Sequence, residues 1–169
     1  MKVVTDSVCE EKNFEAIYSL QSEPLFRFMY YKFADRDKAA DHVQESFVKL
    51  WNNCAKVSYE KAKSYLFTVA NNSFLNEMAH LKVKQNFLQL NHKHYTNQDP
   101  EFLLEEKDFA KKLEKAIEGL NEKQRTVFLL HRIEQKKYSE IAEILDLSIK
   151  AVEKRMGQAL KELRKSIKI

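Results

Sequence analysis

The chain has 169 residues, with 29 Lys and Arg against 25 Asp and Glu, a formal net charge of +4 and 44% hydrophobic residues. Two Gly and two Pro give few turn signals, so few strands are expected, and the composition is that of an ordinary soluble helical protein. No apolar run approaches the roughly 18–20 residues of a membrane span, and the first residues lack the core of a signal peptide, which indicates a cytoplasmic protein. Two cysteines are too few for a disulfide framework, so reduced thiols are expected.

The charge is unevenly distributed along the chain. Residues 109–169 carry 15 Lys and Arg against 9 Asp and Glu, residues 1–84 carry 12 against 11, and residues 85–108 carry 2 against 5. We therefore expect an all-α protein with two small helical domains, residues 1–84 and 109–169, joined by an acidic linker at residues 85–108. The positive excess on the second domain is what a phosphate-binding module needs.

The chain opens with a polar segment, residues 1–12, that we expect to be frayed. Apolar and aromatic residues then recur at helical spacing from Phe14 to Phe33, which predicts core-forming helical segments interrupted near Pro24. The stripe contains Phe14, Ile17, Tyr18, Leu20, Leu25, Phe26, Phe28, Met29 and Phe33.

Residues 39–53 predict an amphipathic helix. Its apolar positions follow steps of three and four: Ala40, Val43, Phe47, Leu50 and Trp51. Its polar positions form a ridge: Asp41, Gln44, Glu45 and Lys49. Asp41 and Glu45 are four residues apart, and two carboxylates at that spacing repel mildly. The ridge is either a solvated face or a surface that docks on a basic or polar partner.

Residues 54–63 break the periodicity and predict a loop, and residues 64–84 predict the next helix. Asn72, Asn76 and His80 recur on one face, and because Asn is a mediocre interior helix residue, they suggest a use for their amides or an exposed surface. Tyr65 could stack on an unpaired base, with packing as its alternative role. In the linker, His92 and His94 lack a nearby third ligand, so no metal site is expected.

The second domain is predicted to contain four helices. Residues 109–118 form the first, which Gly119 ends. Asn121 and Gln124 form a capping box for the second, which ends near Glu134. Residues 138–163 then predict two helices joined by a tight turn at residues 146–148, in which Ser148 is the N-cap of the second helix.

This last pair of helices has the pattern of a helix-turn-helix. The inner positions of its second helix are Ile149, Val152, Met156, Ala159, Leu160 and Leu163, and the outer ones are Lys150, Lys154, Arg155, Gln158 and Lys161. Such an outer face can enter a DNA major groove, where Arg and Lys read guanine and Gln reads adenine. The alternative is a helical hairpin whose charged face is merely solvated.

Three stretches together resemble the extracytoplasmic-function class of bacterial RNA polymerase sigma factors, sigma-70 proteins with regions 2 and 4 only. ADHVQESFVKLW is similar to the helix that docks on the polymerase clamp. YLFTVANNSFLNEM resembles the helix after the promoter-melting loop, and LNEKQRTVFLLHRIEQKKYSEIAEILDLSIKAVEKRM resembles the region that binds the minus-35 element. The resemblance implies core RNA polymerase, promoter DNA and an anti-sigma factor as partners, with no catalysis, cofactor, metal or small-molecule substrate. It also implies that the acidic linker threads toward the RNA exit path.

The resemblance also implies a role for individual positions. The polymerase-binding residues would be Asp41, Gln44, Glu45 and Lys49. The minus-10 DNA-binding residues would be Lys61, Lys63, Tyr65, Asn72 and Asn76, with the loop at residues 54–63 meeting the non-template strand. The minus-35 DNA-binding residues would be Ser148, Lys150, Lys154, Arg155, Gln158 and Lys161. The chain departs from the family pattern at Tyr65, usually Trp, at the weakly basic residues 77–84, and at Glu153, often Lys or Arg.

Two other functions compete with this interpretation. The first is a two-domain helix-turn-helix regulator that acts on DNA without core polymerase, and the polar ridge of residues 41–49 argues against it. The second is a helical adaptor with no role on nucleic acid, and the charge of the last domain argues against that. An enzyme fits worst, because no nucleophile–base grouping, Gly-rich phosphate loop or metal-ligand cluster is present in the sequence.

Overall fold

The computed structural model describes residues 7–88 and 106–167. In these ranges every regular element is a helix, and the one β-type contact is an isolated bridge between Ser7 and Ser58. The predicted all-α fold is confirmed. None of the helices in the described part is both long and apolar enough to cross a membrane.

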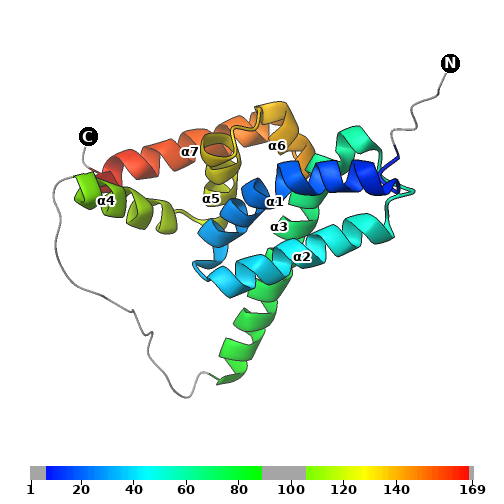
Figure 1. Cartoon of the computed structure of the whole chain (residues 1–169). Helices are drawn as coiled ribbons and strands as arrows, with labels where there is room; N and C mark the ends of the chain where they lie inside the picture. Colours follow the sequence, from blue (N-terminus) through cyan, green and yellow to red (C-terminus); the bar gives the residue numbers. More distant parts are fainter. Residues whose placement is uncertain (1–6, 89–105, 168–169) are drawn as a thin grey trace.

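The first domain consists of α1 (Glu11–Phe33), α2 (Arg36–Asn52) and α3 (Tyr59–Leu88). In Figure 1, α1 and α2 lie side by side and α3 crosses them. The buried apolar residues are Ile17, Leu25, Phe28 and Met29 of α1, Val43, Phe47 and Leu50 of α2, and Leu66, Phe67, Ala70 and Phe74 of α3. The predicted inner stripes are confirmed for these positions. Tyr18 (49% exposed), Leu20 (64%) and Trp51 (45%) were expected in the core and lie at the surface instead.

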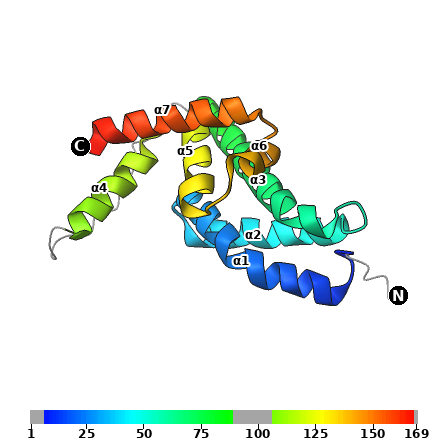
Figure 2. The same cartoon turned by 90° about the horizontal axis from the view of Figure 1, so that it is seen from above.

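Helix α1 is continuous through Pro24, so the predicted interruption is wrong. A proline inside a helix removes one backbone hydrogen bond and normally kinks or breaks the helix. Here buried side chains lie on both sides of the proline, Ile17 before it and Leu25 after it. Packing against the same core holds both halves, and Figures 1 and 2 show a change of direction midway along the helix.

The segment before α1 is held in place, contrary to the expectation of a frayed start; residues 1–6 lie outside the described residues. Val8 is fully buried, and the side-chain amide of Asn13 donates to the Ser7 carbonyl at 2.9 Å. Cys9 and Cys54 form a disulfide with a Cα–Cα distance of 5.0 Å. The expectation of reduced thiols is therefore wrong, because the packing of α1 along α2 brings residues 45 positions apart into contact.

The loop after α2 is shorter than predicted. Helix α3 begins at Tyr59, not at residue 64, and continues to Leu88. The Lys61 amide donates to the Ser58 carbonyl, which starts the first turn, and Glu60 in that turn complements the helix dipole. Lys61 and Lys63 therefore lie on a helix and not in a loop.

The second domain contains α4 (Glu106–Glu118), α5 (Glu122–Phe128), a π-helical turn η1 (Leu129–Ile133), α6 (Tyr138–Leu145) and α7 (Ile149–Ile167). The predicted caps form: the Asn121 side chain accepts from the Gln124 amide at 3.0 Å, and the Ser148 hydroxyl accepts from the Ala151 amide at 3.2 Å. Asp146 turns the chain between α6 and α7 in the left-handed conformation, with φ 51°. Ile149, predicted to face inward, is 49% exposed.

Two buried lysines cross between the domains, one from each side. The ammonium of Lys32 on α1 lies 2.6 Å from the Glu122 carboxylate and donates to Thr126 at 2.9 Å, both on α5. It also donates to Asn71 of α3 at 2.5 Å. In the other direction, the ammonium of Lys136 lies 3.7 Å from the ring centroid of Phe67 on α3. The two domains therefore share one closely packed interface.

Loss of the disulfide should destabilise the first domain. For Cys9→Ser we expect the free energy of unfolding to fall by about 2–4 kcal/mol, because an open chain gains entropy when it unfolds. Urea denaturation measures this, and reductant should lower the parent to the level of the variant while leaving the variant unchanged. A parent whose midpoint does not move with reductant would contradict the structural role of the bond.

Substitutions at the buried ion pair should have opposite signs. Burial lowers the pKa of Lys32 to about 8, against the opposing effect of Glu122. The unfolded chain, with a normal lysine pKa near 10.5, then binds more protons between pH 8 and 10.5, so this lysine destabilises the fold most below pH 8. We expect Lys32→Met to be neutral or stabilising at pH 7, and Glu122→Ala to destabilise by about 1–3 kcal/mol because it leaves a buried charge unpaired.

Denaturation at pH 7 and pH 9.5 checks this expectation. The parent should gain stability relative to Lys32→Met as the pH rises. A constant difference between the two proteins across this range would show that Lys32 does not titrate with a lowered pKa.

Candidate nucleic-acid and protein interfaces

The outer face of α7 is the most regular charged surface among the described residues. Val152, Met156, Ala159 and Leu163 are buried, which turns the opposite side of the helix to solvent. Of the residues predicted to bind minus-35 DNA, Lys150, Lys154, Gln158 and Lys161 are exposed and Arg155 is half-buried. Ser148 is exposed but caps the helix through its hydroxyl. The structure thus brings all six predicted positions to one edge of the domain.

Gly157 lies on the same face, a feature that sequence reasoning did not single out. A Cβ at this position would meet nothing within 4 Å, so the fold does not require glycine there. Glycine inside a helix costs roughly 0.5–1 kcal/mol relative to alanine. Its absent side chain leaves the backbone between Lys154 and Lys161 open to close approach by a partner.

A second surface lies at the start of α3. A pocket of about 340 Å³ is lined by Lys56, Val57, Ser58, Lys61, Ser64, Tyr65, Thr68 and Glu143. It combines lysine ammonium groups with the half-buried ring of Tyr65. Positive charge beside an aromatic ring suits a phosphodiester chain with an unstacked base. The residues that line the pocket come from the loop after α2, from the first three turns of α3 and, at Glu143, from α6.

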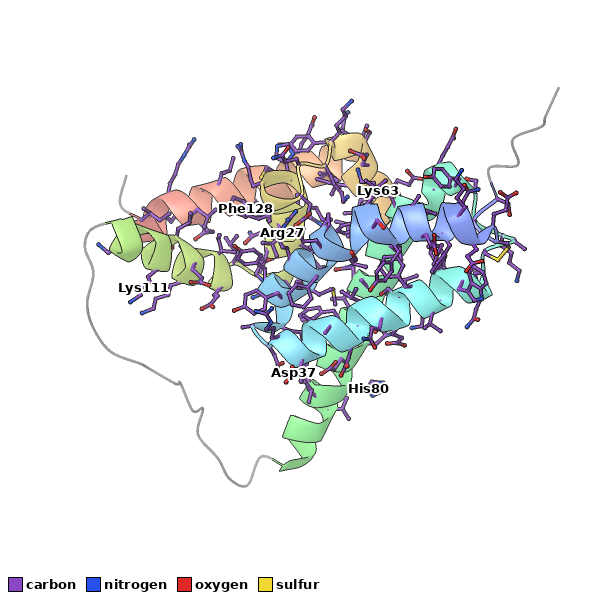
Figure 3. The ribbon with its side chains drawn as sticks, viewed as in Figure 1. Arg27, Asp37, Lys63, His80, Lys111 and Phe128 are labelled. Carbon is purple, nitrogen blue, oxygen red and sulfur yellow. A yellow bond between two sulfur atoms is a disulfide. The ribbon has the colours of Figure 1, made fainter. Side chains whose placement is uncertain are left out.

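The structure does not gather every residue predicted to bind minus-10 DNA at this pocket. Lys61 and Tyr65 line it, whereas Lys63 lines a separate pocket with Arg27 and Lys136. Figure 3 shows Arg27 and Lys63 in the region where the first domain meets the second. Asn72 and Asn76 are exposed further along α3. At four- and seven-residue steps from Tyr65 they continue its face of the helix.

The polar ridge on α2 faces solvent as predicted. Asp41, Gln44 and Glu45 are exposed, and Lys49 is half-buried. The Lys49 ammonium lies 2.7 Å from the Glu45 carboxylate, and this hydrogen bond is the largest cause of the lowered pKa of Glu45. The expected repulsion within the ridge is thus offset by Lys49. A groove of about 370 Å³ between α1 and α2 borders Gln44.

Sequence reasoning missed a polar network beneath this ridge. The His42 ring contacts Ser73 at 2.8 Å and the Glu77 carboxylate at 2.7 Å, and Lys38 lies 2.8 Å from the same carboxylate. The hydrogen bond from Lys38 is the largest cause of the lowered pKa of Glu77. These contacts join α2 to α3 and fix the ridge relative to the pocket. The spacing of His42 from Val43 and Phe47 hid it among inward-facing residues.

None of the described residues form a cluster of three or more His, Cys, Asp or Glu side chains that could hold a metal. His92 and His94 lie outside the described residues. What these surfaces offer is therefore charge, amide groups and an aromatic ring for binding.

Comparison with known families agrees with this geometry. The model of Sigma-70 region 2 matches residues 18–82, and that of Sigma-70, region 4 matches residues 110–163, so the two cover more than half of the chain. The chain is 25% identical over 158 residues to the RNA polymerase sigma factor YlaC of Bacillus subtilis (strain 168), which covers 90% of this chain and 91% of that protein.

Two solved structures share the fold. The sigma factor RpoE, in complex with the anti-sigma factor NepR from Bartonella quintana, superposes with a TM-score of 0.76 at 22% identity, over 94% of this chain and 98% of that one. CnrH, in complex with the cytosolic domain of CnrY, superposes with a TM-score of 0.66 at 18% identity, over 95% and 96%. Since regions 2 and 4 match in order along one helical chain, the protein belongs to the sigma-70 family of transcription initiation factors, in its extracytoplasmic-function class.

Proposed function

We propose that this sigma factor reads the minus-35 element of its promoters with the outer face of α7. The observation that carries the proposal is the separation of the helix into a buried apolar side and an exposed side with Lys150, Lys154 and Gln158. A helix of this kind fits the major groove with its side chains at the base edges. Arg155 and Gln158 are the candidates for base reading, because guanidinium and amide groups form paired hydrogen bonds with guanine and adenine.

The pocket at the start of α3 is the proposed site for the melted minus-10 strand. Lys56 and Lys61 would contact its phosphates, and Tyr65 would stack on a displaced base. Asn72 and Asn76 extend the same helix face and would bind neighbouring nucleotides. Lys63 lies away from this pocket, so its proposed role is limited to the backbone at the edge of the DNA or to the contact with the second domain.

The ridge on α2 is the proposed docking surface for core RNA polymerase. Its three exposed polar residues, Asp41, Gln44 and Glu45, stand on a helix that is anchored from below by the His42 and Lys38 contacts with Glu77. A rigid base for exposed charges favours a protein interface over a solvated face. A regulator that acts without polymerase is not favoured, because region 2 of the sigma-70 family matches this domain.

Regulation and location follow from the same family. RpoE and CnrH were each solved with a partner protein, an anti-sigma factor in the first case and the cytosolic domain of CnrY in the second. We propose that an anti-sigma factor also controls this protein in the cytoplasm, and that it acts by binding and not by catalysis. Domain limits at residues 84 and 109, with an acidic connection between them, complete the proposal; most of that connection lies outside the described residues.

The assignment of α7 predicts two classes of variant. Removal of a phosphate contact at Lys150 or Lys154 should weaken transcription from all promoters and reduce the salt dependence by about one ion. Removal of a base contact at Arg155 or Gln158 should cost about 1–3 kcal/mol on the preferred sequence and relax preference at one position. Run-off transcription with core polymerase, on promoters selected from a randomised template library, measures both effects across a salt series.

A matched control for this experiment is Lys165→Ala, which removes a lysine of α7 that pairs with Glu162 of the same helix. It should leave promoter preference unchanged. If all four substitutions transcribe like the parent, the outer face of α7 does not contact DNA.

The assignment of the α2 ridge predicts a loss of polymerase affinity without loss of fold. For Asp41→Ala/Glu45→Ala we expect binding to weaken by several kcal/mol if the partner charges stay buried. Affinity is measured by native gel or fluorescence with core enzyme, and circular dichroism reports the fold. The control is Asp37→Ala, an exposed acid in the first turn of the same helix (Figure 3). Equal affinity of the double variant and the parent would refute the docking surface.

A further inference from the structure

The promoter-strand pocket is covered on one side by the other domain of the same chain. Figures 1 and 2 both show α6 beside the first half of α3. The Lys61 ammonium lies 2.9 Å from the Glu143 carboxylate, and Lys63 lies 3.2 Å from Glu140. The Thr68 hydroxyl donates to the Ile144 carbonyl at 3.0 Å. Glu143 also lines the pocket, beside Tyr65.

The ion pairs across the interface all have the same polarity in the described residues. The first domain supplies the cation each time and the second supplies the carboxylate: Arg27–Glu134, Lys32–Glu122, Lys61–Glu143 and Lys63–Glu140. This is unexpected for a second domain with a positive excess, in which Lys and Arg outnumber Asp and Glu by 15 to 9 over residues 109–169. The domain turns carboxylates toward its neighbour and leaves the cations of α7 in solvent.

A carboxylate on a lysine occupies the position that a phosphate would take, since both are anionic oxygen groups that bind the same donor. We propose that α6 masks the minus-10 surface in the free protein, with Glu143 in the place of a strand phosphate at Lys61. The closed arrangement then competes with single-stranded DNA for the same pocket, and the domains must separate before the strand can enter.

Promoter geometry requires the same separation. Elements named minus-35 and minus-10 lie about 25 base pairs apart, which is roughly 85 Å of duplex at 3.4 Å per pair. Helix α7, with 19 residues, is only about 28 Å long. Its domain touches α3 directly in the closed form, so α7 and the pocket cannot reach both elements together. Engagement of one element therefore favours release of the mask from the other.

The inference rests on the proposed minus-10 role of the pocket, and charge-reversal variants separate the two. Glu143→Lys replaces the attraction to Lys61 by repulsion. Lys61→Glu/Glu143→Lys restores the attraction with exchanged charges. The matched control is Glu162→Lys, which makes the same charge change at an exposed position of α7 that pairs only within its helix.

Two measurements on the free full-length protein are needed. Small-angle X-ray scattering gives the radius of gyration, and fluorescence anisotropy gives the affinity for a labelled 12-nucleotide single strand of mixed sequence. We expect Glu143→Lys to expand and to bind the strand about three- to tenfold more tightly than Glu162→Lys does. The exchanged double variant should return to the compact size but bind weakly, because Lys61 is absent. Circular dichroism should be alike for all four proteins.

The opposite results are equally distinct. If Glu143→Lys neither expands nor binds more tightly than Glu162→Lys, or if it expands without binding more tightly, the mask does not exist. The minus-10 role is then judged separately by Lys61→Ala in run-off transcription with core polymerase, where strand capture and not closure of the free protein is measured. Normal transcription by Lys61→Ala would remove the proposed function of the pocket as well.

Discussion

A single buried ammonium group couples the two domains. Lys32 comes from α1, yet its partners lie on α3 (Asn71) and on α5 (Glu122 and Thr126). Removal of a charge from water costs several kcal/mol unless the site returns hydrogen bonds and a counter-charge. The rings of Phe28 and Phe74, at 5.1 and 4.5 Å, complete the surroundings. Three helices must therefore be in place together, and the position of α5 fixes where the helix-turn-helix stands.

The interface also explains why each functional surface faces the way it does. Once α5 is held over α1, α6 falls against α3 and α7 is turned outward, with its basic residues in solvent. At neutral pH Lys32 keeps its proton, because a pKa of about 8 is still above 7. The contact is thus ionic under ordinary conditions, and ionic contacts with partly exposed partners are weak enough to be exchanged for others. An interface of this kind can hold two domains without locking them.

Sequence periodicity predicted much of the fold and of the site. The inner positions of α2 and α7 and the caps at Asn121 and Ser148 depend on neighbours within about one turn, and the chain itself specifies these. The exposed ridge on α2 and the basic face of α7 follow from the same spacing. Sequence also identified Lys61 and Tyr65, which the structure places at one pocket.

The features that sequence did not predict all depend on contacts distant in the chain. Val8 is buried and Cys9 is bonded only because α1 packs along α2, and Pro24 stays helical because core packing outweighs one missing hydrogen bond. The ion pairs of Lys61 and Lys63 join residues about 80 positions apart, beyond any local pattern. Ile149 has an inward position by spacing, but at the first turn of α7 no neighbouring helix covers it. Periodicity tells which face is apolar and cannot tell what lies opposite.

The covalent connection between Leu88 and Glu106 has a further consequence. A chain of this length spans at most roughly 60 Å, so the two domains never leave one another's vicinity. Joined in this way they meet at an effective concentration on the order of millimolar, far above that of any protein in a cell. Re-association after separation is then a first-order event whose rate does not depend on how many copies of the protein are present. A cell that makes more of this sigma factor changes how much of it exists, but leaves the fraction in the closed form unchanged.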